Sequence, residues 1–358
     1  MVLKQLSRLA SGCALTALLS AATAAGACGF HLVKAEKTPV DWLVDASHLV
    51  LARPDPEQPM RYDRGQVLRG GDGIGRLPFL VDSARRRQFD ANSEDSMLFA
   101  ANEDGNWVLV SYADENFRTI MAQVLDKAED WKGSYGEDRF HTVETLMDHP
   151  DPAIRRLALS EIDKAPYAML REIDHGLPAE QILDDLWTLE GYPYQPVRIL
   201  LLGISGSEMA REEVHGYMER VRSWAWSDNL GAFSTALIEL DGALGIDLLE
   251  DYFLSDPDQP LDKLDMVVAA VSEHHAYGDP ALGGRLTAAI ERFLAVRPEA
   301  LGMAARQFAA RSDWSLAPLL EPAMANRESL NAQDLVTIAV YLAQAKAEAA
   351  LAAPLSEG

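Results

Sequence analysis

One stretch decides how the second half of the chain folds: Asp148-His149-Pro150-Asp151-Pro152-Ala153-Ile154-Arg155-Arg156-Leu157-Ala158-Leu159. Asp151 is a residue type that caps helices, and Pro152 suits the first helical position because the N–H it lacks is not needed there. Apolar residues then recur at helical spacing: Ile154, Leu157, Ala158 and Ile162. The segment Asp163-Lys164-Ala165-Pro166 breaks this helix, and a second helix is predicted from Tyr167 to Ile173.

Similar helix–break–helix units fill the chain as far as about residue 347. Their lengths of about 30 to 45 residues are typical of stacked helical repeats. One helix is expected from Gln195, and paired segments follow at 228–240 with 244–254, 261–274 with 281–296, and 298–310 with 314–325. Residues 348–358 are Ala-rich and predict a flexible tail.

The quoted stretch and the helix after it resemble a HEAT-type repeat, and the later units are similar in period. The resemblance implies an α-helical solenoid over residues 135–347, in which stacked helix pairs leave a long groove. Such arrays serve mainly in protein interaction, so the resemblance implies a binding module.

Residues 38–130 have the pattern of short strands separated by turns. Five apolar runs are candidate strands: 49–51, 62–68, 77–81, 97–100 and 107–110. The Asp104-Gly105 step between the last two is typical of a hairpin turn. We expect a small antiparallel β-barrel, capped by a helix from Phe117 to Ala128. The fold class is therefore α+β, a small barrel followed by a helical solenoid.

The strand order resembles the netrin-like, OB-type β-domains of exported proteins. The resembling pieces are 46–53, 66–70 and the hairpin at 97–110. Animal members that inhibit proteases use an N-terminal Cys-x-Cys, whereas this chain has Cys28-Gly29-Phe30. Inhibitor activity is therefore not implied.

The N-terminus has the layout of a secretory signal peptide, assigned to residues 1–27. Lys4 and Arg8 precede an apolar run from Leu9 to Ala22, which is short for a membrane span. Ala25-Gly26-Ala27-Cys28 fits both an ordinary cleavage site and a bacterial lipobox, with Ala25 in place of the usual Leu. Both alternatives place the protein in the cell envelope, either periplasmic or anchored by a lipid on Cys28. No transmembrane helix is expected.

The charge balance narrows the classes of partner. The chain has 55 Asp and Glu against 32 Lys and Arg, a net charge of −23. Such a chain repels phosphate backbones and anionic lipid surfaces, so nucleic acid is not an expected partner. The cluster Arg85, Arg86 and Arg87 is interpreted as a solvated strand end or loop. Membrane contact is expected only through a lipid on Cys28.

Glu273, His274 and His275 are the weak candidates for metal ligands. Adjacent helical residues point about 100° apart, so they do not converge on one ion without help. We therefore interpret the two histidines as exposed or capping residues, and no cofactor is predicted. Trp224, Trp226 and Tyr252 are candidates for a binding groove, with solenoid core as the favoured alternative.

Four other patterns have structural interpretations that outweigh the functional ones. His141 and His149 could face one side of a helix, but Pro150 ends that helix, and His149–Pro152 is interpreted as an inter-helix turn. Gly203–Ser207 lacks the final Gly of a nucleophile elbow, so Ser207 is interpreted as a helix start. Gly70–Gly75 is expected to be an inter-strand loop. Asp256, Asp258, Asp262 and Asp265 lack the spacing of a calcium loop and are interpreted as solvated loop acids.

These features favour an exported, non-catalytic protein-interaction or scaffold module that binds an envelope protein. One alternative is a binder of a small ligand, glycan or metal at the domain junction. Another is an envelope hydrolase whose carboxylates and histidine come from non-adjacent segments.

Overall fold

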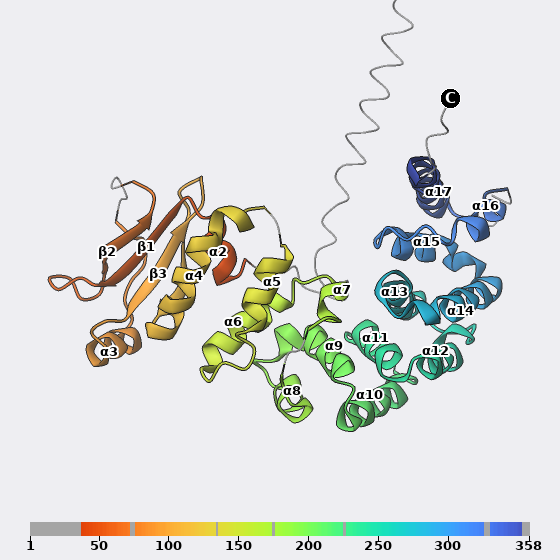
Figure 1. The fold of residues 1–358 in the computed structure, drawn as a ribbon, viewed down its shortest axis with the longest axis horizontal. Helices are drawn as coiled ribbons and strands as arrows, with labels where there is room; N and C mark the ends of the chain where they lie inside the picture. Colours follow the sequence, from red (N-terminus) through yellow and green to blue (C-terminus); the bar gives the residue numbers. More distant parts are fainter. Residues whose placement is uncertain are drawn as a thin grey trace, which may run out of the picture. The chain divides into compact units, whose positions relative to one another are not determined.

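The computed structural model describes residues 37–71, 76–133, 135–173, 176–224, 227–325 and 330–352. They divide into two compact units, coloured from red to yellow-green and from green to blue in Figure 1. The sheet unit contains the described residues up to Lys164 and those of 173–177. The helical unit contains Ala165–Glu172 and the described residues from Pro178 onward. The sequence-predicted boundary near residues 130–135 falls inside the sheet unit.

The sheet unit is built on a four-stranded antiparallel sheet of order β2-β1-β3-β4. Its strands are β1 (His48–Pro54), β2 (Tyr62–Arg69), β3 (Ser96–Ala101) and β4 (Trp107–Ala113). Alternate residues of β1 face two different cores, because successive strand side chains point to opposite faces. Leu49 and Leu51 pack with α2 (Pro39–Asp45) and α4 (Glu115–Trp131). Val50 and Ala52 pack on the other face with α3 (Ser83–Ala91).

The prediction of a closed barrel is wrong. Among the described residues, β2 and β4 are the two edges of an open sheet. The expected strand at 77–81 contributes one isolated bridge, between Arg61 and Leu80, and Leu77 and Val81 fill the core instead. The arginine cluster lies in α3 rather than at a strand end or in a loop. That helix begins where the Asp82 side chain accepts a hydrogen bond from the Arg85 backbone N–H.

Two helices complete the sheet unit, α5 (Glu137–Glu144) and α6 (Pro152–Ile162). The cap expected at Asp151 is confirmed, since its carboxylate accepts from the Ala153 N–H at 2.9 Å, and Pro152 opens the helix. The inter-helix turn expected at His149 is also confirmed. There the His149 ring Nδ1 accepts from the Asp151 N–H.

The helical unit contains the remaining helices. They are α7 (Tyr167–Leu170), α8 (Ala179–Leu186), α9 (Gln195–Ser205), α10 (Glu208–Val221), α11 (Leu230–Asp241), α12 (Ala243–Leu249), α13 (Leu261–Tyr277), α14 (Gly283–Val296), α15 (Leu301–Ala309), α16 (Ala317–Ala325) and α17 (Ala332–Ala352). A π-helical turn, Glu250–Leu254, follows α12. The last helix therefore runs past Ala347, where the sequence predicted a flexible tail to begin.

These helices form two layers. The first layer is a row in which α9, α11, α13, α15 and α17 each contact the next, and α10, α12, α14 and α16 cover it (Figure 1). Gly203 allows α9 to approach α11 closely, because a Cβ there would lie 2.8 Å from the Cα of Ala236. Gly206 ends α9 in the left-handed region, and Ser207 caps α10 as expected.

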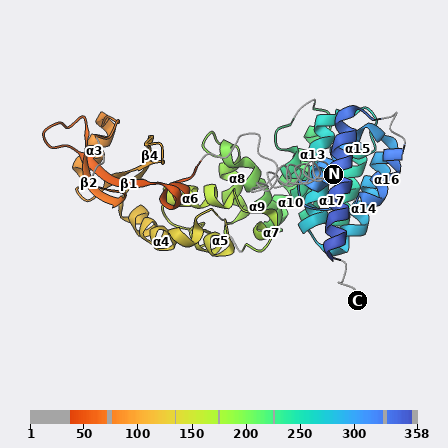
Figure 2. The same cartoon turned by 90° about the horizontal axis from the view of Figure 1, so that it is seen from above.

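α17 differs from the other helices of the row. Figure 1 and Figure 2 both place it beside α15, which it contacts. Figure 1 shows it at the end of the row, beyond α15. By length and composition, α17 is the one helix of the described residues that is long and apolar enough to cross a membrane.

Candidate functional site

One group of titratable residues of the helical unit gathers at one end of the row, where α11, α13 and α15 terminate. Glu239 lies in the last turn of α11, His274 and His275 in the last turn of α13, and Arg311 just after α15. Helices of one row lie side by side, so residues far apart in sequence meet across these ends. We call this set of contacts the polar ladder.

The first step of the ladder joins α7 to α11 through the carboxylate of Glu239. The Tyr167 hydroxyl donates to this carboxylate at 2.6 Å, and the Arg171 Nε donates to it at 3.0 Å. Burial raises the pKa of Glu239, but the hydrogen bonds from Arg171 and Tyr167 outweigh it and hold the pKa below its ordinary value. Glu239 is therefore an ionised, fully engaged group.

His274 is buried between these helices, with 2 % of its surface exposed. Its ring Nε2 lies 2.9 Å from the Thr235 carbonyl oxygen and 3.3 Å from the Tyr167 hydroxyl. Burial lowers the pKa of His274 to about 4, so the ring is neutral at neutral pH. Its Nδ1 has no hydrogen-bond partner, and the carboxylate of Glu239 lies 3.9 Å away. The expectation of an exposed or capping His274 is wrong, because the packing of α13 on α11 covers the ring.

The next step joins α13 to α15 and to the segment after it. Glu273 accepts from the Arg311 Nε at 2.5 Å, and both side chains are buried. The His275 ring Nδ1 lies 2.5 Å from the carboxylate of Asp313, and its Nε2 lies 3.1 Å from the Thr287 hydroxyl. Burial raises the pKa of Asp313, but hydrogen bonds from His275 and Ser315 outweigh it and lower the pKa.

The three candidate metal ligands therefore point toward three different partners. Glu273 binds Arg311, His274 faces α11, and His275 faces Asp313 and α14. In the part of the chain that the structure describes, no group of three or more His, Cys, Asp or Glu side chains is placed to hold a metal ion.

Asp313, His275 and Thr287 have the carboxylate–imidazole–hydroxyl order of a nucleophilic triad. The Thr287 hydroxyl also lies 3.0 Å from the Gly283 carbonyl oxygen, one helical turn earlier. A hydroxyl has a single hydrogen, so it cannot donate to both the carbonyl and the imidazole. The Thr287 hydroxyl therefore has a competing acceptor within its own helix.

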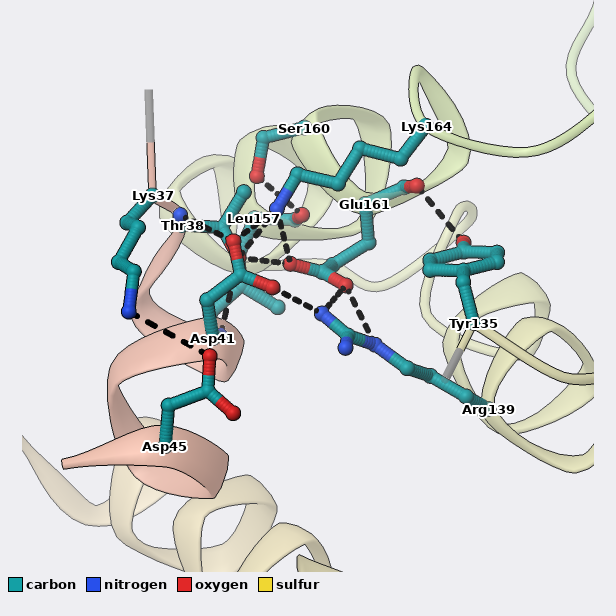
Figure 3. A network of polar contacts seen from close by, with 10 residues as sticks. All are labelled: Lys37, Thr38, Asp41, Asp45, Tyr135, Arg139, Leu157, Ser160, Glu161 and Lys164. Carbon is teal, nitrogen blue, oxygen red and sulfur yellow. Dashed lines mark hydrogen bonds and ion pairs between the residues drawn. The ribbon is translucent and has the colours of Figure 1, made fainter. Parts of the chain in front are cut away.

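A second polar network lies in the sheet unit and was not found from the sequence (Figure 3). Glu161 on α6 is fully buried, and its carboxylate accepts from Arg139 at 2.5 Å and from the hydroxyl of Thr38. Asp41 accepts from Arg139 at 2.7 Å and also binds Lys164. Two carboxylates thus meet two cations, and the network carries no net charge.

This network fastens the first helix of the unit to α5 and α6. Thr38 caps α2 while its hydroxyl reaches α6, and Asp41 lies in the first turn of α2. Burial raises the pKa of Asp41, but hydrogen bonds from Lys164 and Arg139 outweigh it and lower the pKa. The Tyr135 hydroxyl donates to the Glu161 backbone carbonyl at 2.7 Å. Every charged group in the network is paired with another, which is typical of a network that stabilises the fold. We call these residues the sheet-unit ion-pair network.

Two of the aromatic groove candidates, Trp224 and Tyr252, lie near the C-terminal end of α10. Trp224 follows that helix and is 51 % exposed. Tyr252 donates to Glu219, and the Arg222 guanidinium lies 4.1 Å from its ring centroid. Lys263, which the sequence did not single out, is buried and donates to three backbone carbonyls, those of Val221, Arg222 and Trp224. Trp226 and Cys28 lie outside the described residues, as does the predicted signal peptide.

The structure bears on two further predictions, the acidic cluster and the glycine-rich loop. Asp262 and Asp265 lie in α13 rather than in a loop, and Asp265 accepts from Arg306 and Gln307 across the row. Of the glycine-rich loop, only Gly70 and Gly71 lie in the described residues.

No protein-family model matches the chain, and the searches of curated proteins and of solved structures return no match either. The helical array and the small antiparallel sheet are compatible with a helical repeat domain and a β-domain, whereas the HEAT-type and netrin-like resemblances rest on sequence pattern alone.

Proposed function

We propose that the chain is an exported cell-envelope protein whose helical unit is a HEAT-like scaffold that binds a partner protein. In this proposal the sheet unit offers a second surface. The predicted signal peptide at residues 1–27 supports a location in the cell envelope, with either a lipid on Cys28 or release into the periplasm. The molecule works by holding a partner, without chemistry of its own.

The observation that carries this proposal is the polar ladder. Its titratable groups bind one another across helices, from Arg171 and Glu239 to Glu273 and Arg311. A catalytic group needs a free face toward a substrate, whereas these groups are used to fix the row of helices. A braced row presents its surface residues in one geometry, which lowers the entropy cost of binding.

The surface that best suits a partner is the segment between α8 and α9. Trp187, Leu189 and Tyr192 are 51 %, 92 % and 56 % exposed. The Trp187 ring stacks on buried Phe233 at 6.3 Å, and Phe233 stacks on Tyr217 at 3.6 Å. Exposed aromatic side chains held on a rigid base are typical anchors of protein interfaces.

A photo-crosslinking experiment in cells tests this surface. A photoreactive amino acid would replace Leu189, and the matched control would carry it at Leu244, which is 69 % exposed on α12. We expect one dominant envelope protein to crosslink at position 189, and its yield to fall in a Trp187→Ala background. The same weak products at both positions would remove this surface from the proposal.

A second candidate function, hydrolysis, is favoured only by the order Asp313–His275–Thr287. A screen of ester, amide and glycoside substrates tests it with the wild type, Thr287→Val and His275→Gln. The scaffold proposal expects no turnover above the blank. Turnover that both substitutions abolish would replace the scaffold proposal with a hydrolase.

A further inference from the structure

We infer that α17 is a self-association surface, and that it packs antiparallel against α17 of a second copy of this chain. The inference does not depend on the partner proposed above. The two sides of α17 differ in exposure. Ile338, Tyr341 and Leu342 are buried against the array, whereas Val336, Val340 and Leu351 are 64 %, 47 % and 80 % exposed.

The exposed side continues an interface that the array already uses. Each helix of the row buries one side on the helix before it and another on the helix after it, as α13 does between α11 and α15. α17 packs on α15, where Gly302 leaves room for the Asp334 side chain. Among the described residues no helix follows α17, and a helix that ends a solenoid needs a polar outer face to remain soluble alone. The outer side of α17 has instead the composition of an internal contact.

Charge favours this helix as the meeting point of two copies. The chain has a net charge of −23, so most pairs of surfaces on two copies repel each other. Residues 335–345 contain no charged side chain. Two copies that meet along this segment therefore bring their least repulsive surfaces together.

The exposed residues are complementary to themselves under two-fold symmetry. An antiparallel pair with its axis between residues 341 and 342 places Val336 opposite Ala347 and Val340 opposite Ala343. The same axis places Leu351 opposite Ala332, so each large side chain faces an alanine; all six residues are exposed. Large-to-small pairing of this kind lets two helices approach closely, and a two-fold interface requires such self-complementarity.

A disulfide experiment tests the predicted register in the full chain with Cys13 and Cys28 replaced by Ser. The double variant Val336→Cys, Ala347→Cys should form disulfide-linked dimers, because each thiol faces its counterpart on the other copy. The controls are the two single variants, whose thiols are separated along the pair by several turns. Cα atoms more than about 7 Å apart cannot be bridged, so the single variants should form far less dimer. Equal yields in all three would overturn the inference.

Sedimentation of the unmodified chain tests the association itself. We expect a reversible dimer, and Ala343→Glu should raise its Kd by about 100-fold or more, because it buries two carboxylates beside the axis. Glu348→Gln, a change outside the exposed apolar side, is the control and should leave Kd unchanged. Circular dichroism checks that α17 stays folded. A chain that remains monomeric at high concentration, or that instead binds lipid vesicles through α17, would refute self-association.

Discussion

Acidification from about pH 7.5 to about pH 5 should destabilise the helical unit by about 2 kcal/mol through His274 alone. The unfolded chain binds a proton on this ring below its ordinary pKa of about 6.5, whereas burial lowers the folded pKa to about 4. The unfolded state therefore gains protons first as the pH falls. The stability that neutral His274 contributes is present above about pH 6.5 and is lost between there and about pH 4.

The magnitude follows from the two pKa values. At about pH 5 the unfolded ring is almost fully protonated and the folded ring is about one-tenth protonated, which gives the 2 kcal/mol. For a unit of this size, such a loss lowers Tm by roughly 4–8 °C. Glu239 adds little in this range, because its pKa is lowered from an ordinary value of 4.5 and its contribution is lost only at more acidic pH.

The assay is urea unfolding of the wild type and of His274→Gln at both pH values. The variant should be less stable at pH 7.5, but its further loss on acidification should be smaller by about 2 kcal/mol. Phe293→Leu on α14 is the matched control, since it opens a cavity at a buried site without removing a titratable group. Its pH dependence should equal that of the wild type. If His274→Gln retains the full acid loss, the assignment to His274 is wrong.

Three other substitutions should give measurable changes in unfolding free energy. Glu161→Gln should destabilise the sheet unit by about 3 kcal/mol, because Arg139 loses the charge of a fully buried partner. A loss below about 1 kcal/mol would contradict a stabilising role for this ion-pair network. Lys263→Met should cost about 2 kcal/mol, because three carbonyls at the end of α10 lose their donor. Ser312→Gly should instead raise stability by about 1 kcal/mol, because Ser312 has a φ of 54°, in the left-handed region that glycine adopts freely. Thermal unfolding checks the last change, with an increase in Tm of roughly 2–4 °C.

The sequence predicted those features that depend on neighbouring residues. The cap at Asp151, the helix start at Ser207 and the helix over 117–128 are local signals, and the structure confirms all three. The error at residues 77–91 has a non-local origin. The apolar run at 77–81 has the composition of a strand, but whether it joins a sheet depends on partners elsewhere in the chain.

The polar groups could not be predicted in the same way, because each is defined by a distant partner. Arg139 meets Asp41 from 98 residues away, and Tyr167 meets His274 from 107 residues away. A lone His or Glu on an apolar helix carries no signal of whether it will be buried, paired or exposed. The sequence identified His274 and His275 as unusual, but it placed them on the surface because their partners lie on other helices.

The polar ladder and the exposed side of α17 both depend on whether a neighbouring helix is present in the row. Titratable side chains in the row are satisfied by the next helix, as Glu273 is by Arg311 and Asp265 by Arg306. In the part of the chain that the structure describes, no helix follows α17, so a charged group on its outer side would gain no such partner within the array. Its polar contribution to the ladder is Tyr341, which points inward and binds Leu316 and Asp313. One exposed stripe of α17 consists of valine, leucine and alanine, whose burial requires only a second apolar surface, and in the proposed dimer another α17 supplies one.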